Sequence, residues 1–389
     1  MDTNEQPPPP REVRPLVSQR VALARFPLIC GVVLIHALYN VNTITASPGA
    51  PDDWGAWLLN WVGDIGPRAS VPLLTAISGY LYFHGFDGGL HSYGQKLGAR
   101  LRTLAIPFLL WNLAVLAVFL VGLSLPGTAA YFGGHGAAVT RMGPPELVVW
   151  LLGLNGNPPA YQFWFVRNLF LMGLAAPLLY RALQLAGLPL CLGLTGLWLA
   201  GAEPLAQWNL LYTTVFFSWG ALLQLRGVDL AAGDRYLVPL VLVFGLASAF
   251  AGHQVTTAPA ADHARLIGAV RLIGCATLWV VLGWVQRVAP VWAQRGARLA
   301  PYAFFLFAAH EPAARIASRL VNRVLSPESF LRPHWLGPVL ALATVLVVTA
   351  AAAGLHRFVP PLYRLVAGRR PPPHTGGHLP PHPTTAPSP

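Results

Sequence analysis

The stretch VALARFPLICGVVLIHALY, residues 21–39, decides the fold of this chain. It is long and apolar enough to predict a first membrane-spanning helix, and only Arg25 and His36 interrupt it. An ionisable side chain at membrane depth is costly unless it faces a protein interior or a wet cavity, so both residues are functional candidates. Eleven residues at about 100° each bring them to one helix face, about 16 Å apart along the axis.

Composition extends this prediction to the whole chain. Of 389 residues, 54% are hydrophobic and 10% are charged, and mean hydropathy is +0.52. The pattern predicts an all-α, polytopic transmembrane helix bundle with about ten spans. The net charge of +12 does not indicate nucleic-acid binding, because the basic residues lie singly between apolar runs. The expected spans cover residues 21–39, 69–86, 103–124, 162–183, 188–201, 208–225, 236–252, 265–287, 302–322 and 336–357.

The distribution of basic residues orients the bundle. An excess of arginine and lysine marks cytoplasmic loops, and this rule places both termini in the cytoplasm. We expect a disordered N-terminal tail over residues 1–20, a transmembrane domain over 21–365 and a disordered Pro/His-rich tail over 366–389. One outer segment carries Arg315, Arg319, Arg323 and Arg332 against this rule. Since Glu311, Arg315 and Arg319 repeat every four residues, the sequence predicts a charged stripe facing the bundle interior or an outer cavity, or else a misplaced ninth boundary.

The chemistry of the first pair follows from this topology. Arg25 lies near the inner surface, where a guanidinium suits a phosphate, and His36 lies in the outer third, where a neutral imidazole can take a proton from a hydroxyl as its oxygen attacks a carbonyl. The structural alternative is that Arg25 reaches the inner headgroups and His36 is a hydrogen-bonded core residue. The presence of Arg25 and His36 on one helix face favours the functional interpretation over the structural one.

Five segments resemble acyltransferase family 3 membrane proteins, specifically the surface-polysaccharide O-acyltransferase branch. The first is Arg25-FPLICGVVLI-His36; Arg68-ASVPLLTAISGYLYF-His84, Lys96-LGARLRTLAIPFLLWN-Asn112, Gln162-FWFVRNL-Leu169 and Phe304-FLFAAHEP-Pro312 follow in the same order. The resemblance implies transfer of an acyl group, usually acetyl from acetyl-CoA, to a sugar hydroxyl. It implies that Arg25 and His36 serve the donor step and deprotonation, and that the site is lined by Arg68, Ser78, Trp164, Arg167 and His310. Asn168 stands where relatives often have an acidic residue.

Most of these residues also have a structural alternative. Ser78 and Gly79 could be a close-packing contact, Trp164 an interfacial anchor, and Arg167 a headgroup contact. His310 is a stronger candidate because it lies about 12 Å into its helix beside Glu311. Adjacent helical residues point about 100° apart, so we expect Glu311 to pair with Arg315 rather than with His310.

Other chemistries lack sequence support. The chain has no GxSxG, HExxH or GxxxxGK[ST] pattern and no metal-ligand spacing of His, Cys and carboxylates. We therefore expect metal-free acyl transfer, with acyl-CoA as co-substrate, a glycan acceptor and the lipid bilayer as partners. High Arg, Ala, Gly and Pro content indicates a GC-rich bacterial genome and hence the cytoplasmic (inner) membrane. A transporter or flippase for a glycan or amphipathic substrate is the main alternative, although no internal repeat is visible, and a lipid-linked glycosyltransferase is another.

Overall fold

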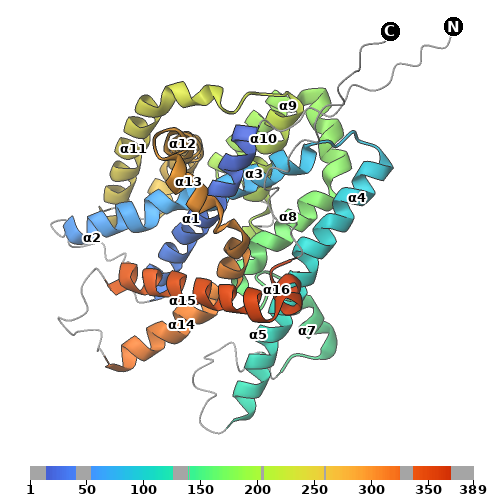
Figure 1. The fold of residues 1–389 in the computed structure, drawn as a ribbon, viewed down its shortest axis with the longest axis vertical. Coiled ribbons are helices and arrows are strands. Elements are labelled where there is room, and N and C mark those ends of the chain that lie inside the picture. Colours follow the sequence, from blue (N-terminus) through green and yellow to red (C-terminus); the bar gives the residue numbers. More distant parts are fainter. Residues whose placement is uncertain are drawn as a thin grey trace, which may run out of the picture.

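The computed structural model describes residues 15–40, 54–125, 139, 141–202, 206–257, 260–324 and 336–368. Within these ranges the regular structure is helical throughout, without a strand (Figure 1). This confirms the predicted all-α fold. Most residues of the predicted N-terminal and C-terminal tails lie outside the described part of the chain.

Helix α1 (Pro15–Asn40) runs through the middle of the bundle (Figure 1). It packs against α3 (Ser70–Phe83), α13 (Pro290–Ala297), α14 (Ala303–Val324) and α15 (Leu336–Phe358). Its residues Ala24, Val33, Ala37 and Leu38 are fully buried. Because neighbours surround α1, Arg25 and His36 face protein rather than lipid.

Helices α3 and α10 (Leu210–Leu225) cross with their backbones in direct contact. A Cβ atom on Gly79 would lie 2.1 Å from the carbonyl oxygen of Phe217, and one on Gly220 would lie 1.9 Å from that of Ala76. Small residues allow membrane helices to approach this closely. Gly79 is therefore a packing residue, while its neighbour Ser78 points into a cavity described below.

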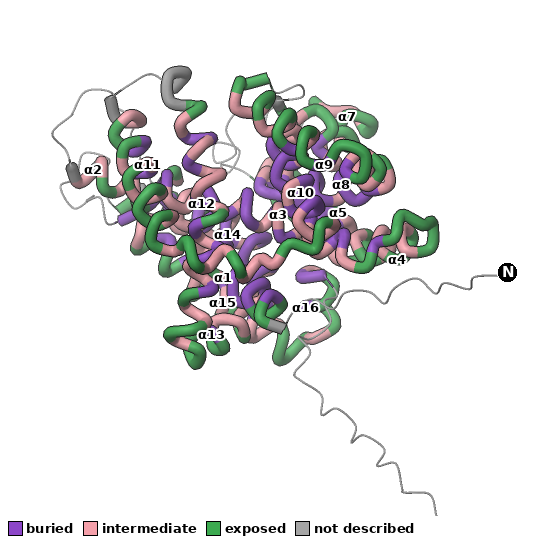
Figure 2. The backbone as a smooth tube through the Cα atoms, turned by 90° about the horizontal axis from the view of Figure 1, so that it is seen from above, coloured by how far each residue is buried: buried purple, intermediate pink, exposed green. Residues whose placement is uncertain are grey.

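Exposed residues recur along the outer helices of the bundle (Figure 2). These helices are α5 (Ile106–Ser124), α9 (Ala176–Leu199), α11 (Leu237–Thr257) and α15. Their exposed residues include Val118, Leu178, Leu185, Leu246 and Val347. Exposed apolar surface of this extent is typical of helices that face lipid.

The remaining helices complete the bundle. They are α2 (Trp54–Leu59), α4 (Leu90–Arg100), α7 (Pro144–Leu151), α8 (Trp164–Leu174), α12 (Ala260–Val288) and α16 (Pro360–Val366), with the π-helical η1 (Asn60–Ile65) and η3 (Leu101–Ala105). Several helices of the bundle are preceded by a short 3₁₀ turn. These turns are η2 (Gly66–Ala69), η5 (Tyr161–Phe163), η6 (Ala206–Trp208), η7 (Ala232–Tyr236) and η8 (Ala300–Tyr302).

Six helices among the described residues are long and apolar enough to cross a membrane. They coincide with the predicted spans that begin at residues 21, 103, 188, 236, 265 and 336. The other four predicted spans fall on α3, α8 and α10, which are short, and on α14, which carries Glu311 and several arginines. The chain is thus an integral membrane protein by composition and length, and the count of ten spans with cytoplasmic termini stays a prediction.

One predicted boundary is wrong. The fourth span was expected to continue to residue 183, but α8 ends at Leu174 and α9 begins at Ala176 with Pro177 in its first turn. Proline is favoured in a first turn, where no backbone N–H is needed, and it disrupts a helix interior. A second interruption lies at Ala186, whose backbone is not helical, three residues before Pro189.

Candidate active site

His36 lies at the centre of a cluster contributed by α1, η5 and α14. Its Nδ1 is 3.3 Å from Oε2 of Glu311 and also contacts the hydroxyl of Tyr161. The ring of His310 meets it edge to face, with centroids 5.0 Å apart. The Tyr161 hydroxyl can donate to this nitrogen or accept from it, whereas the facing carboxylate can only accept and therefore favours the tautomer with the proton on Nδ1. Nε2 is then the basic nitrogen of a side chain that is 22% exposed.

Glu311 is fixed from two sides. Arg315, one turn further along α14, donates from Nε to Oε1 at 2.5 Å, and Asn40 donates from Nδ2 to Oε2 at 3.4 Å. The Arg315 guanidinium also lies over the Tyr161 ring, 5.3 Å from its centroid. The predicted pairing of Glu311 with Arg315 is therefore observed, and the same carboxylate also reaches His36, which the sequence did not predict.

Pro312 explains why α14 and η5 meet here. A proline inside a helix has no N–H to donate to the carbonyl four residues earlier, which is that of Ala308. The buried Gln162 fills this position, because its Nε2 donates to the Ala308 oxygen at 2.9 Å. The His310-Glu311-Pro312 element and the segment beginning at Gln162 are thus bonded to each other, and this bond holds Tyr161 next to His36.

His310 is completely buried. Its Nδ1 lies 2.6 Å from the carbonyl oxygen of Phe307, which can only accept, so Nδ1 carries the proton. Nε2 has no hydrogen-bond partner although it is buried. A lone pair is therefore left without a partner beside the ring of His36, where a substrate group could donate to it.

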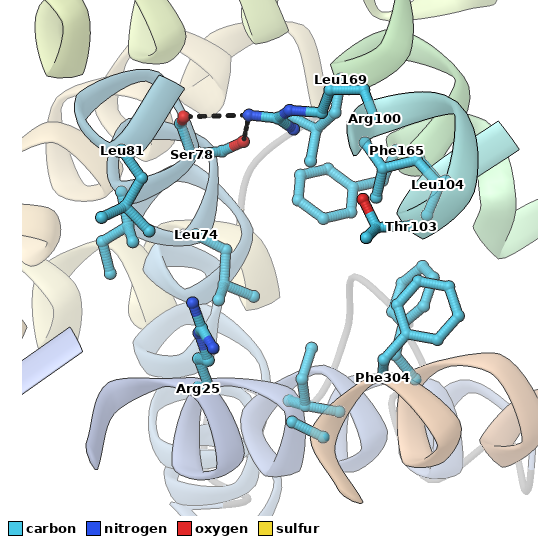
Figure 3. A pocket seen from close by; sticks show the side chains of 15 residues that line it. Arg25, Leu74, Ser78, Leu81, Arg100, Thr103, Leu104, Phe165, Leu169 and Phe304 are labelled. Carbon is cyan, nitrogen blue, oxygen red and sulfur yellow. Dashed lines mark hydrogen bonds between the residues drawn. The ribbon is translucent and has the colours of Figure 1, made fainter. Parts of the chain in front are cut away.

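Arg25, eleven residues before His36 on the same helix, lines a cavity of about 350 Å³ (Figure 3). Ile29, Ser78, Arg100 and Phe307 also line it. Arg100 donates to the Ser78 hydroxyl at 2.9 Å and to the Ser78 carbonyl oxygen at 3.1 Å. No carboxylate lines the cavity, and Arg25 makes no hydrogen bond or ion pair with another described residue. Two guanidinium groups without a carboxylate beside them make this cavity electrostatically favourable for an anion.

The cavity and the His36 cluster are joined through shared side chains. Phe307 lines the cavity, and its carbonyl oxygen accepts from His310. Ile29 lies one turn after Arg25 on α1 and lines the same cavity. The structure therefore brings Arg25, Ser78, His36, His310 and Glu311 of the predicted site into one region.

Arg68 lies in a separate network at the end of α1. It forms a two-pronged ion pair with Asp64 at 3.0 and 2.7 Å and donates to the Tyr39 hydroxyl at 2.8 Å. Tyr39 follows His36 by three residues, so this network lies within about one helical turn of the candidate base.

Arg167 and Trp164 support surrounding structure. The Arg167 guanidinium is bound to the carbonyl oxygens of Gly153, Gly156 and Trp208, and it lies over the Trp208 ring. It therefore holds the loop before α8 rather than facing the cavity. Asn168 donates from Nδ2 to the Trp208 carbonyl oxygen at 2.6 Å and to the Thr213 hydroxyl at 3.0 Å. The amide thus makes contacts that a carboxylate, which has no donor, could not make. Trp164 packs against Tyr212, with ring centroids 6.0 Å apart.

Sequence reasoning missed three contributors to the site. Tyr161 directly precedes the Gln162-Phe163-Trp164 segment and was not considered. Arg100 was treated only as a loop charge, and Asn40 was not considered at all. The first two lie inside or beside the segments that were recognised, so their position was a usable signal.

A metal could be considered at His36, His310 and Glu311, whose donor atoms all lie within 4.8 Å of one another. Tetrahedral zinc at about 2.0–2.1 Å from each ligand needs donor atoms only about 3.4 Å apart. Glu311 is held by Arg315, and His310 donates its Nδ1 proton to a backbone carbonyl oxygen, which leaves Nε2 as the nitrogen it can offer to a ligand. As arranged, these three side chains are tied into a network of hydrogen bonds and ion pairs.

The sequence matches the model of a family described as an acyltransferase domain, the acyltransferase 3 family, over residues 19–356. It is 27% identical over 369 residues to succinoglycan biosynthesis protein ExoH of Rhizobium meliloti (strain 1021). That alignment covers 91% of this chain and 93% of the relative. No solved structure matches the chain.

Proposed function

This chain belongs to the acyltransferase 3 family of membrane enzymes, and on that premise we propose that it transfers an acyl group, most simply acetyl, from acyl-CoA to a sugar hydroxyl of a polysaccharide or other glycan. The name of the relative supports a glycan acceptor, because it concerns the biosynthesis of succinoglycan. The observation that carries the proposal is that a single helix, α1, places Arg25 in a cationic cavity and His36 in a cluster built around a carboxylate.

The cavity binds the acyl-CoA donor in this proposal. Arg25 and Arg100 pair with its phosphates, and Ser78 orients Arg100. Apolar residues such as Ile29, Phe304 and Phe307 line the cavity and accommodate the pantetheine arm and the thioester. The donor then enters from the cytoplasmic face of a bacterial inner membrane, the side to which the charge distribution assigns Arg25.

His36 acts as the general base. Nε2 takes the proton from the acceptor hydroxyl while the hydroxyl oxygen attacks the thioester carbonyl. The C–O bond forms and the C–S bond breaks, and the imidazolium returns its proton to the CoA thiolate, so that the products are the ester and free CoA. Glu311 stabilises the imidazolium that forms, and Arg315 and Asn40 hold Glu311 in place.

His310 orients the acceptor. Its buried Nε2 has an available lone pair beside the His36 ring and accepts a hydrogen bond from a hydroxyl of the sugar. Tyr161 bridges His36 and the Arg315 guanidinium and keeps the imidazole in one orientation. The proposed transfer uses no metal, because bases, acids and cations are all supplied by these side chains.

Release of free CoA by the purified protein tests the proposal. Acetyl-CoA is supplied with and without a crude extract of surface glycans, and wild type is compared with His36→Ala. His91→Ala is the matched control, because His91 is an exposed histidine of α4. We expect extract-dependent release that persists in the control and is lost in His36→Ala.

Normal release by a correctly folded His36→Ala protein would remove the proposed base. Absence of release from wild type with any extract or acyl-CoA would instead favour the transporter alternative.

A further inference from the structure

A second cavity, of about 470 Å³, lies between α3, α10 and α12. Phe216 and Trp219 of α10 and Leu272 and Cys275 of α12 line its length. Ile77 of α3 lines both this cavity and the cavity of Arg25, so α3 separates the two. The lining is almost entirely apolar, as expected for a groove that holds hydrocarbon rather than water.

At one end of the groove, Trp279 donates from its indole nitrogen to the Leu230 carbonyl oxygen at 3.0 Å, which ties α12 to the segment after α10. Asp229, the acidic residue among those that line the groove, precedes Leu230 and lies at this end. An anionic group is therefore unfavourable at the Trp279 end.

Arg271 lies just beyond the opposite end of the groove, outside the residues that line it. It precedes the groove residue Leu272, and its guanidinium lies over the ring of Tyr212, 5.7 Å from the centroid. The Tyr212 ring in turn packs on Phe216, another groove residue, with centroids 5.3 Å apart. Arg271 therefore marks the end of the groove from which α10 and α12 both run towards Trp279.

The charge of Arg271 lacks a partner among the described residues. Its Nε is buried and has no hydrogen-bond partner, and no described carboxylate forms an ion pair with it. The neighbouring carboxylate, Asp64, is already bound by both prongs of Arg68. Arg68, Arg271 and Asp64 together carry one uncompensated positive charge. A guanidinium whose Nε is buried without a hydrogen-bond partner is costly, which indicates that a ligand supplies the anion.

From this geometry we infer that the groove between α10 and α12 binds a single-chain lipid phosphate, with the phosphate at Arg271 and the hydrocarbon chain along Phe216, Leu272 and Cys275. A cationic end on a long apolar groove complements an amphiphile with an anionic head. A single groove between two helices accommodates one chain, which fits a polyprenyl phosphate rather than a two-chain phospholipid.

The inference rests on the proposed function, because it assigns this lipid as the carrier of the glycan acceptor. Arg68 links the Arg271 end to the Tyr39 hydroxyl, and Tyr39 lies within one turn of His36. A sugar attached to the phosphate can therefore extend past Tyr39 towards the candidate base. The rings of Trp164 and Trp198, which both pack on Tyr212, offer apolar faces along the start of that path.

Equilibrium binding of radiolabelled undecaprenyl phosphate to the full-length protein in phosphatidylcholine nanodiscs tests the inference without acyl transfer. Unlabelled undecaprenol, inorganic phosphate and phosphatidylglycerol are the competitors. We expect undecaprenyl phosphate to compete at least tenfold better than each of them. Arg271→Gln should weaken binding about tenfold, while Arg271→Lys should retain most of it.

Two further variants make the result specific. Arg265→Gln removes an exposed arginine from the same helix and should leave binding unchanged. Ala276→Phe places a ring in the groove, where Ala276 is a lining residue, and should weaken binding at least as much as Arg271→Gln does. Gel filtration of each variant checks that it is folded.

Undiminished binding by folded Arg271→Gln, or equal competition by phosphatidylglycerol, would overturn the inference. The binding measurement needs no turnover, so it tests the lipid site separately from acyl transfer. If binding depends on Arg271 but wild type releases no CoA, the proposed acyl transfer is contradicted and the lipid site is still supported.

Discussion

Replacing Glu311 by Gln removes a negative charge next to the candidate base with little change in shape. The carboxylate lies 3.3 Å from His36 Nδ1, and at an effective dielectric constant of about 20 two unit charges at this distance interact by about 5 kcal/mol. Arg315, which binds the other carboxylate oxygen, offsets part of this energy. We therefore expect the transition state, in which His36 is cationic, to lose about 3–4 kcal/mol, or roughly 10²–10³-fold in kcat.

The assay is steady-state release of CoA from acetyl-CoA. KM for the donor should stay within about a factor of three, because Glu311 does not line the cavity of Arg25. Arg319→Gln is the matched control, since Arg319 is exposed one turn beyond Arg315 on the same helix. A kcat within a few-fold of wild type in folded Glu311→Gln protein would refute the assignment of Glu311 as the partner of the imidazolium.

Four other substitutions test separate parts of the structure. Tyr161→Phe removes the hydroxyl that contacts His36 and should lower kcat roughly ten- to a hundredfold at unchanged donor KM, measured by the same CoA assay. Arg25→Ala should raise KM for acetyl-CoA by a similar factor, because a charge-assisted hydrogen bond is worth about 1.5–3 kcal/mol, and an unchanged KM would contradict the phosphate site. Gly79→Val places a side chain against the Phe217 carbonyl and should destabilise the α3–α10 contact by about 1–3 kcal/mol or more, seen as a lower Tm, whereas Gly94→Ala, with open space around it, should not. Gln162→Leu leaves the Ala308 carbonyl without its donor and should cost about 1–3 kcal/mol, which a Tm equal to that of wild type would disprove.

The features predicted well are those that depend on one helix. The positions of Arg25 and His36 on α1 follow from helical periodicity, and the pairing of Glu311 with Arg315 follows from the four-residue repeat of α14. The helical fold follows from apolar runs of membrane length. In each case the sequence contains both partners of the interaction within a few turns.

The features that were missed join distant segments. Tyr161 reaches His36 across 125 positions, and Gln162 reaches Ala308 across 146. Arg167 was expected at the site and instead binds loop carbonyl oxygens of Gly153 and Gly156. No local periodicity encodes such contacts, because they depend on how the helices are arranged around α1.

The helices that fall short of the membrane-span criteria are the ones that carry much of the site. Ser78 lies on α3, Trp164 and Arg167 lie on α8, and His310 and Glu311 lie on α14. An inner helix faces other protein surfaces, so it can be short or charged without exposing polar groups to lipid. Apart from α1, hydropathy therefore identifies the outer wall of the bundle better than its functional interior.

The spacing of ten residues between Arg25 and His36 acquires a physical reason from this arrangement. Arg25 must face the cavity between α1, α3 and α14, and His36 must face Glu311 on α14, so both side chains have to leave α1 on the same side. One residue more or fewer would rotate His36 by about 100° and separate it from Glu311. The hydrogen bond from Gln162 to the Ala308 carbonyl, which Pro312 leaves free, ties η5 to α14 and so fixes the side of the site opposite α1.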